Sequence, residues 1–493
     1  MPPVRRHPTP VRLLALCTSI GLAFTLAGCA SSVQVPQDST AKQASRVNAP
    51  DAWQAALPHS GSSANLANWW TQWGDSALVQ LIEAAQKESP QLSGAQAGIA
   101  QARAALTGAQ SASQPNLNAT AQASRGVQAP GAPVATSLSG GLQASWEIDL
   151  FGGNRATASA AQLRVRGAEL GWHEARVTVA AEVASLYNQL RYCENAAQLT
   201  QNDASSRSET ARLADLTAKA GLNAPANAAL ARASAADAAA SVRSAQAQCD
   251  VLVKSLVALS GIAEPALRDV LKQNQAQVQK LYAQDALFSI ASLPAQVLAQ
   301  RPDIAAAQDA VVAASYDANA ANARRLPVLS LSGSVGGASV RQAGITNEGL
   351  TWSLGPVAIS LPLLDGGRTA ANTQAAVAAY DDAVVQLRAR ARNAVREVEE
   401  ALINLQSAQA RRADVQAAAT GYQASLTAAQ SRYKAGLASL IELEDARRTA
   451  VFAQQNQLSL ERERLGAWIN LYRAAGGGWT ADSTVASTAA VKP

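Results

Sequence analysis

The stretch RYKAGLASLIELEDARR, at residues 432–448, marks the tip of a predicted helical hairpin. It lies between two long runs of helix-forming residues. Gly436 is a typical helix stop, because glycine adopts without strain the backbone conformation that ends a helix. After it, Leu440 and Leu443 return at helical spacing, which predicts a second helix. The stretch therefore predicts two long helices joined by a short turn.

The same turn phrase occurs twice, which indicates that the chain is a tandem duplication. KAGL stands at positions 219–222 and again at 434–437. Upstream, a helical run that lies between two prolines is also repeated, at 90–115 and at 302–327. The chain is therefore expected to contain two copies of one unit, each with a helix, a strand pair and a helical hairpin.

The composition favours long, closely packed helices over a thick globular core. Of 493 residues, 48% are hydrophobic but only 4% are aromatic, and alanine is abundant. The net charge is +5, but Arg5, Arg6 and Arg12 lie in the segment 1–28, which has no acidic residue, so the remainder carries +2. This balance gives no indication of a nucleic-acid partner.

The N-terminus is typical of a secretory signal. Basic residues precede an apolar run at 13–27, which is too short for a transmembrane helix. The run ends in LAGC at 26–29, which resembles the lipobox of bacterial lipoproteins and implies that Cys29 is lipidated. The alternative is an ordinary signal with a chance cysteine. In lipoproteins an aspartate after the cysteine favours the inner membrane, so Ala30 implies the outer membrane of a Gram-negative bacterium.

Two segments, 115–151 and 327–364, alternate apolar and polar residues, which predicts a pair of β-strands in each repeat. The strands are roughly 9–14 residues long, which is the length that crosses a bilayer at a tilt, and one face is apolar. A phase shift at Gly355-Pro356 predicts a β-bulge. The alternative is a soluble two-sheet layer, but the signal and the lipobox favour a membrane barrel.

The strand count requires several copies of the chain. One chain supplies four predicted strands, whereas bacterial barrels have at least eight, in even number. Four strands would leave two edges of unpaired backbone groups in lipid, which is not tolerated. Several chains must therefore share one barrel.

These signals also set the predicted domain boundaries, which cover the whole chain. In chain order they are a signal peptide at 1–28, an extended lipidated tether at 29–65, repeat one at 66–260, a linker at 261–297, repeat two at 298–479 and a C-terminal tail at 480–493. Repeat one has strands at about 115–151 and a hairpin at 155–260, with arms at 155–217 and 225–260 and its tip near 221. Repeat two has strands at about 327–364 and a hairpin at 369–473, with arms at 369–433 and 438–473 and its tip near 436.

Phrases spread over almost the whole mature chain resemble the TolC-like outer membrane efflux family, most closely its lipoprotein branch of the OprM and NodT type. They are WWTQWGD at 69–75, WEIDLFG at 146–152, RPDI at 301–304, PLLDGGR at 362–368 and GGGW at 476–479. The resemblance implies a homotrimer whose twelve-stranded outer membrane β-barrel continues into a twelve-helix periplasmic tunnel. It also implies two partners, a periplasmic adaptor (membrane fusion protein) and an inner membrane pump, usually of the resistance-nodulation-division type.

The function implied by the resemblance is that of an exit duct in a tripartite pump, which passively conducts small toxic compounds or drugs. A duct for protein secretion is the alternative within this fold, but such ducts are often unlipidated. A lipidated periplasmic coiled-coil adaptor needs only one hairpin, so the two hairpins argue against it. No catalytic or metal-ligating constellation is present, since His7, His59 and His173 are scattered. We therefore expect no enzyme activity and no cofactor beyond the lipid on Cys29, such as palmitate.

The resemblance also assigns roles at the tip of the second hairpin. Glu442 and Asp445 match acidic residues at the closed periplasmic end, and in a trimer each would repeat as a ring that constricts the tunnel and selects for cations. Tyr433 matches a tyrosine that latches neighbouring helices. In repeat one, Asn227 and Leu230 stand at the positions of the two acids. The alternative is that both acids are ordinary surface charges.

The two turns are expected, from the resemblance alone, to meet the helical hairpin of the adaptor. The residues concerned are the glycine and the leucine of each turn, namely Gly221, Leu222, Gly436 and Leu437. The alternative is that these residues only form the turns, which the helical hairpins require with or without an adaptor.

Cys193 and Cys249 are equidistant from Gly221 along the chain. In an antiparallel helix pair, residues equidistant from the turn lie side by side, and the periplasm is oxidising. A disulfide across the first hairpin is therefore predicted. The alternative is two buried free thiols that serve as small apolar residues. The register of the two helices determines which alternative holds. A shift of one residue along a helix turns a side chain by about 100°, and a disulfide needs Cα atoms within ~7 Å.

Overall fold

A computed structural model describes the chain over residues 34–47, 53–55, 69–127, 129–273 and 294–478. The predicted signal peptide, the predicted lipidation site Cys29 and the predicted C-terminal tail lie outside the described residues. The chain divides into two compact units, which are considered separately. One holds the strands and the other holds most of the helical hairpins.

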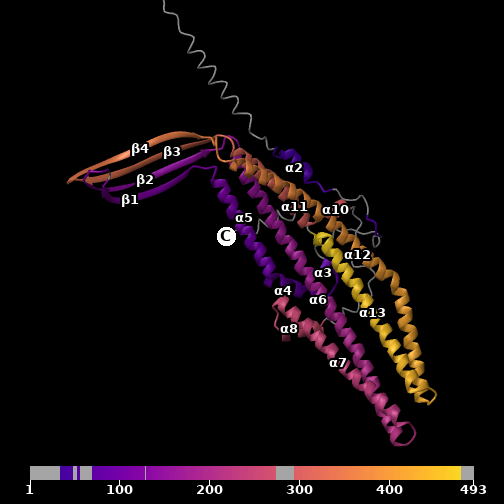
Figure 1. The fold of residues 1–493 in the computed structure, drawn as a ribbon. Coiled ribbons are helices and arrows are strands. Elements are labelled where there is room, and N and C mark those ends of the chain that lie inside the picture. Colours follow the sequence, from indigo (N-terminus) through magenta and orange to yellow (C-terminus); the bar gives the residue numbers. More distant parts are fainter. Residues whose placement is uncertain (1–33, 48–52, 56–68, 128, 274–293, 479–493) are drawn as a thin grey trace, which may run out of the picture. The chain divides into compact units, whose positions relative to one another are not determined.

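The strands form one four-stranded antiparallel sheet with the order β1-β2-β3-β4 (Figure 1). Each predicted strand pair is a hairpin, and β2 pairs with β3 along its length, from Ala135 opposite Gln342 to Ile148 opposite Leu329. The two copies of the repeat are therefore joined edge to edge by backbone hydrogen bonds. The strands span Asn116–Val127 (β1), Val134–Ile148 (β2), Val328–Gln342 (β3) and Ile345–Ser360 (β4).

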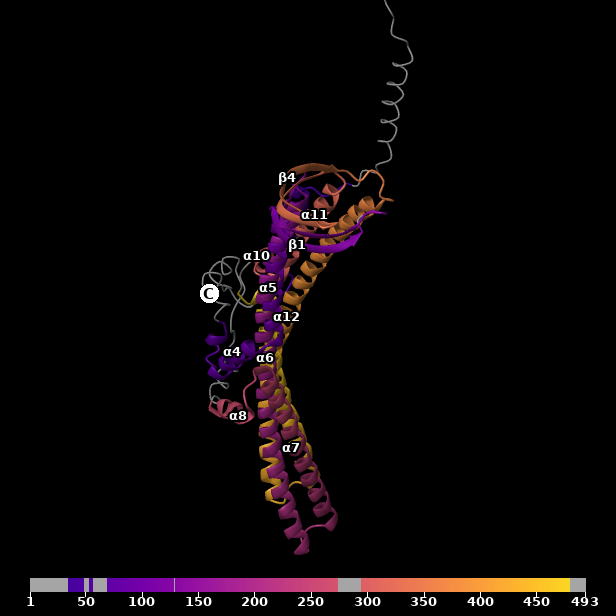
Figure 2. The same ribbon diagram turned by 90° about the vertical axis from the view of Figure 1, so that its left-hand side faces the viewer.

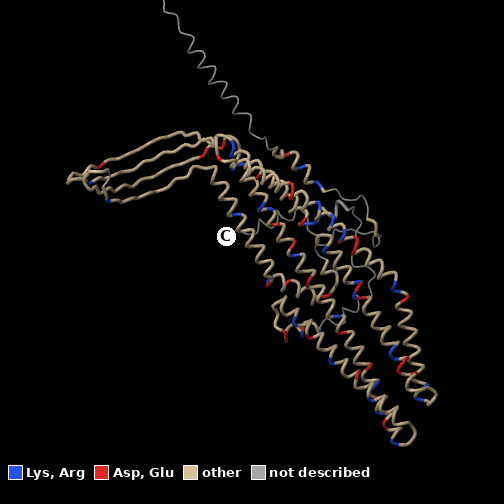
Figure 3. Tube along the Cα trace, viewed as in Figure 1, with Lys and Arg blue, Asp and Glu red and all other residues tan. Residues whose placement is uncertain are grey.

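Charged residues within the four strands lie near strand ends, which leaves the middle of the sheet free of them (Figure 3). They are Arg125, Glu147, Arg341 and Glu348. Between these ends, large apolar side chains on β4 are exposed in the single chain, with Leu350 at 87% and Trp352 at 78%. An exposed apolar band of this kind requires a cover of lipid or of protein.

The predicted bulge at Gly355-Pro356 is confirmed. Leu331 pairs with Val357 whereas Gly333 pairs with Leu354, so the single residue Ser332 lies opposite two residues of β4. Gly355 has φ 106°, in the region that glycine adopts without penalty.

The seam between the repeats has a close approach of two backbones. A Cβ atom on Gly141 would lie 2.6 Å from the carbonyl oxygen of Val335, and one on Gly336 would lie 2.7 Å from the carbonyl oxygen of Gly140. Neither position accepts a side chain unless the strands move apart, because the nearest atoms belong to the backbone.

Two helical hairpins follow the strand pairs (Figure 2). The first consists of α6 (Gly153–Lys219) and α7 (Pro225–Ser260), and the second of α12 (Arg368–Lys434) and α13 (Leu440–Ala474). Every bound lies within two residues of the predicted arm. Helices α6 and α12 are each 67 residues long, as expected of duplicated elements. No helix in the described part of the chain is both long enough and apolar enough to span a bilayer.

Shorter helices surround the hairpins in the sequence. Helices α5 and α11 correspond in the two repeats, and each has 22 residues and begins at a proline, which suits the first turn of a helix. The short helices are α2 (Asp38–Ala44), α3 (Trp69–Gln72), α4 (Ser76–Glu88), α5 (Pro90–Ser111), α8 (Glu264–Gln273), α10 (Pro294–Ala299), α11 (Pro302–Ala323) and the 3₁₀ turn η3 (Gly476–Gly478).

The described part of the predicted extended tether is only partly extended. It contains α2, in which Asp38 pairs with Lys42 one turn later at 3.2 Å. Further along, the backbone amides of Gln54 and Ala55 donate to the two carboxylate oxygens of Glu399 at 2.6 and 2.8 Å. The first contact lies within α2, and the second attaches residues 54 and 55 to Glu399.

The main apolar core of the helical unit gathers aromatic rings. Trp69 stacks on Tyr472, with ring centres 4.9 Å apart and planes at 14°, and Trp73 meets Trp69 edge-on at 4.9 Å. Asp75 follows these tryptophans and caps α4 by accepting hydrogen bonds from two of its backbone amides. The tryptophan-rich motif thus attaches the start of repeat one to the last long helix.

A second set of contacts joins the beginning of repeat two to its end. Arg301 donates to Glu397 at 2.7 Å and to the carbonyl oxygen of Ala474 at 3.0 Å. Gly476 has φ 82°, and a Cβ there would lie 2.2 Å from the carbonyl oxygen of Gln300. The RPDI and GGG phrases are therefore two sides of one contact.

Replacing Gly141 with alanine should destabilise the sheet by about 1–3 kcal/mol, since the added methyl group must displace backbone atoms. The measurement is the urea midpoint of the purified protein in detergent, followed by tryptophan fluorescence. Gly349→Ala is the matched control, because a Cβ on this β4 glycine meets nothing within 4 Å. Equal midpoints for the two variants would show that the seam tolerates a side chain.

Candidate functional site at the hairpin tips

The two hairpin tips share one turn geometry. Gly221 and Gly436 both have φ 73°. The backbone amide of the next residue donates to a carbonyl five residues earlier, at 2.9 Å for Leu222 and 2.8 Å for Leu437. This is the Schellman pattern, in which a left-handed glycine ends a helix. Both leucines are well exposed, at 81% and 71%, so the four predicted docking residues lie on the surface of the single chain.

The predicted gate carboxylates lie at the start of α13. Ser439 caps this helix by accepting a hydrogen bond from the backbone amide of Glu442 at 3.1 Å, which fixes the first turn. Glu442 then pairs with Arg432 at 2.5 Å, and Asp445 pairs with Arg448 at 3.1 Å. Both pairs are largely exposed. Exposed pairs contribute only ~0–1 kcal/mol, so either carboxylate can change partners in an assembly.

Tyr433 is half-buried between the two hairpins. It packs against an apolar cluster of α6, α7 and Leu440, and also against a cluster around Leu443 within the second hairpin. Burial raises the pKa of Tyr433, and the nearby charge of Glu444 raises it further. The predicted latch tyrosine therefore lies where the hairpins meet.

The tip of repeat one differs from that of repeat two, as its sequence indicates. Asn227 donates to Asn223 at 2.8 Å, and Leu230 is 46% exposed. Neither residue provides a carboxylate, so within one chain the acidic tip belongs to the second hairpin.

A buried charge cluster close to the tip was missed from the sequence. It consists of Asp203 and Arg207 on α6 and of Glu444 and Arg447 on α13. The side chain of Arg447 is only 2% exposed, and burial lowers its pKa while the carboxylate of Glu444 opposes this effect. A signal was present, because Arg447 continues the apolar seam of Leu440 and Leu443, and a charge in such a seam requires a buried partner.

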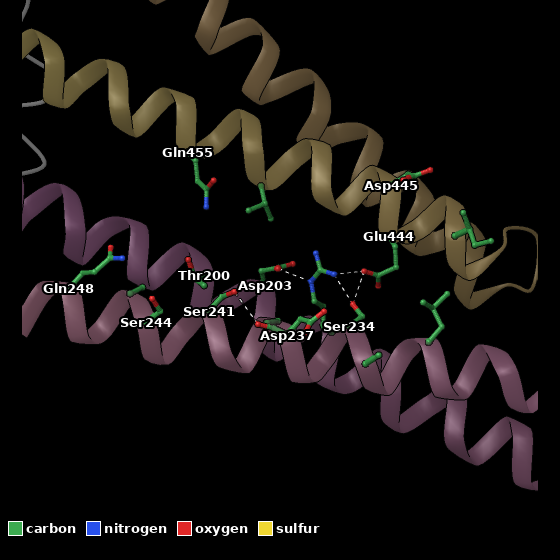
Figure 4. A pocket seen from close by; sticks show the side chains of 17 residues that line it. Thr200, Asp203, Ser234, Asp237, Ser241, Ser244, Gln248, Glu444, Asp445 and Gln455 are labelled. Carbon is green, nitrogen blue, oxygen red and sulfur yellow. Dashed lines mark hydrogen bonds and ion pairs between the residues drawn. The ribbon is translucent and has the colours of Figure 1, made fainter.

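A groove of about 740 Å³ lies beside this cluster, between α7 and α13 (Figure 4). Small or polar side chains of α7, including Ser234, Asp237 and Ser241, line one wall. Glu444 and Asp445 lie on the opposite wall. The charge cluster thus lies at the contact between the two hairpins and is partly open to this groove.

Cys193 and Cys249 form a disulfide in the structure, with Cα atoms 5.6 Å apart. Cys193 is buried, and Cys249 packs against the main apolar core. The helix register of α6 and α7 therefore brings together the two cysteines that are equidistant from the turn. No group of three or more His, Cys, Asp or Glu that could hold a metal ion occurs among the described residues.

Long paired helical hairpins, each preceded by a strand pair, define the class of outer membrane channel proteins with a helical extension. The sequence profile of the outer membrane efflux proteins matches residues 81–262 and 293–477. The chain belongs to the outer membrane efflux protein family, and it is a channel protein rather than an enzyme.

Relatives span nearly the full chain. The pyoverdine export outer membrane protein OpmQ of Pseudomonas aeruginosa is 27% identical over 93% of this chain and 96% of its own length. The outer membrane protein OprJ of the same species is 29% identical, over 93% and 95%. The cation efflux system protein CusC of Escherichia coli K12 is 28% identical, over 95% and 100%.

Solved structures give the same result. The outer-membrane channel OprN is 25% identical, with a TM-score of 0.72 over 88% of this chain and 98% of its own. A membrane protein from Pseudomonas aeruginosa is 27% identical, with a TM-score of 0.76 over 87% and 98%.

Denatured, unreduced mature protein should contain no reactive thiol at Cys193 or Cys249. Their bond closes a 56-residue separation, so replacing both with serine should lower the free energy of unfolding by about 2–4 kcal/mol. Thiol titration with peptide mapping checks the first statement and urea denaturation checks the second. Two free thiols per chain at these positions would contradict the bridge.

Proposed function

We propose that the protein is the outer membrane exit duct of a tripartite efflux pump and passively conducts small toxic compounds or drugs out of the cell. One observation carries the proposal: a single chain combines strands that are free of charge in their middle with two long helical hairpins. The strands suit a lipid environment. The hairpins suit a conduit that extends from the membrane toward partner proteins.

A homotrimer would complete the barrel. The sheet of one chain ends in β1 and β4, and each has one edge without a strand partner in the described chain. Unpaired backbone groups are not tolerated in lipid, so β4 of one copy is proposed to pair with β1 of the next. Three copies give twelve strands, which is within the range of known barrels, and also twelve hairpin helices.

The proposed partners are a periplasmic adaptor and an inner membrane pump of the resistance-nodulation-division type. The exposed leucines of both tips support an adaptor contact, because an exposed turn with an apolar side chain offers a docking point. Cys29 is proposed to carry a lipid that anchors the chain in the outer membrane. Mass spectrometry of the N-terminal peptide tests this, and an unmodified Cys29 would contradict it.

The relatives support small cargo over secreted proteins. OpmQ is named for pyoverdine export and CusC for cation efflux. Because these cargoes differ while the fold is shared, the cargo of this chain is proposed only as a small solute. The pump that loads the duct would then determine the substrate.

The purified protein should behave as a trimeric channel. Multi-angle light scattering in detergent is expected to give three chains per particle, and planar bilayers are expected to show discrete conductance steps. Deleting the gene in its host should increase sensitivity to toxic small molecules and leave the secreted proteins unchanged. A monomer that forms channels would refute the shared barrel, and the absence of channels would refute the duct.

The double variant Glu442→Ala/Asp445→Ala should have a higher single-channel conductance, weaker cation selectivity and weaker block by divalent cations. The reason is that rings of carboxylates in a narrow pore attract cations and bind divalent ions. Glu209→Gln is the control, since Glu209 is a similarly exposed acid near the other tip. Unchanged conductance, selectivity and block would place the constriction elsewhere.

A further inference from the structure

We infer that Glu444 and Arg447 are positioning residues, which attach the first turns of α13 to the first hairpin and so hold Glu442 and Asp445 at the constriction. The inference rests on the proposed duct function and deepens it. It assigns to one buried charge, Arg447, and one largely buried charge, Glu444, a role in conduction that the exposed carboxylates cannot perform alone.

Glu444 is bound from both helices of the first hairpin. One of its carboxylate oxygens accepts hydrogen bonds from Arg207 of α6 at 2.5 Å and from Ser234 of α7 at 2.9 Å. Arg207 also donates to Ser234 at 2.7 Å, so the three side chains form a closed set of contacts. Figure 4 labels two of them, Ser234 and Glu444. A single side chain of α13 is thus attached to both α6 and α7.

Arg447 makes a second attachment one turn further along α13. It donates to the hydroxyl groups of Ser206 and Thr210 on α6, each at 3.1 Å, and it pairs with the other oxygen of Glu444. Its Nε atom also lies 3.8 Å from Asp203. The two attachments share Glu444, so the cluster behaves as one unit across the contact between the hairpins.

The cluster is costly to bury, which argues for a role other than stability. The four side chains are between 2% and 19% exposed, and two positive charges balance two negative ones. A buried ion pair often stabilises a fold no better than apolar residues would, and in some proteins its role is to specify one arrangement. What this cluster specifies is the position of α13 on the first hairpin.

That arrangement fixes the rotation of α13 about its own axis. Successive helical residues are separated by about 100°, so a helix with Glu444 turned toward the first hairpin must present Glu442 and Asp445 in other directions. Apolar contacts alone permit small rotations, because the cluster around Leu440 consists mostly of alanines. Directional hydrogen bonds to Glu444 do not permit them.

The direction of the effect follows from repulsion within the proposed rings. Three copies of Glu442 and Asp445 around one axis repel each other, and the repulsion favours a wider constriction. The cluster around Glu444 opposes this spreading from within each chain. Loss of the cluster should therefore widen the pore.

The test is single-channel recording of full-length Glu444→Gln, which has nearly the same shape but no charge. The expected result is a higher mean conductance, weaker block by divalent cations, and an open-to-closed ratio shifted at least about tenfold toward open. Glu209→Gln is the matched control, because it removes the same charge from an exposed pair with Arg212. Wild-type conductance in Glu444→Gln would overturn the inference.

A second variant covers the case in which Glu444→Gln leaves a buried positive charge and fails to assemble. Glu444→Gln/Arg447→Gln is balanced, since it keeps the pair of Asp203 and Arg207 within α6. It should form a trimer with a near-normal melting temperature and still show the wider pore. If neither variant forms a trimer, the cluster serves folding and the inference is wrong.

A double-mutant cycle separates positioning from a general loosening. If Glu444 acts through the rings, adding Glu444→Gln to Glu442→Ala/Asp445→Ala should not change divalent block further. The inference would be overturned if Glu444→Gln weakened divalent block in this background by as much as it does in the wild-type protein. Failure of the proposed duct gives a different result, because the wild-type protein itself would then form no channel.

Discussion

The structure depends on the backbone hydrogen bonds between β2 and β3. These two strands belong to different copies of the repeat, so their pairing makes one sheet from two separate hairpins. The approach of Gly141 and Gly336 across this seam is closer than a side chain on either residue would allow. Duplication alone supplies two similar units, whereas this seam determines that they share a sheet, and it makes β1 and β4 the edge strands of the described sheet.

The sequence predicts the helical part of the fold well because its boundaries are set by local chemistry. Gly221 and Gly436 end helices through a backbone conformation that other residues avoid. Prolines begin α5, α7 and α11, and Ser439 caps α13. Equal spacing from Gly221 likewise brings Cys193 and Cys249 together, since both arms continue from the turn without interruption. The position of Gln54 and Ala55 in the tether is less predictable, because both donate to Glu399 of repeat two, which is remote in sequence.

The candidate site is predicted only in part. Its exposed charges are positioned by spacing along one helix, whereas its buried cluster is positioned by contacts between distant parts of the chain. Glu442 and Asp445 are exposed, so spacing along one helix locates them, but their partners Arg432 and Arg448 emerge only from the structure. Glu444 is held by side chains of the first repeat, far earlier in the chain, and no local pattern indicates that contact. A charged residue in an apolar seam, such as Arg447, was the one available sign of it.

The disulfide makes the maturation of this protein depend on its compartment. A chain held in the reducing cytoplasm keeps both thiols, so no covalent bond then joins α6 to α7. After export, oxidation joins α6 to α7 within one copy of the chain and requires no neighbouring copy. The bond can therefore form within a single chain, so the first hairpin is joined covalently without contact with any other protein.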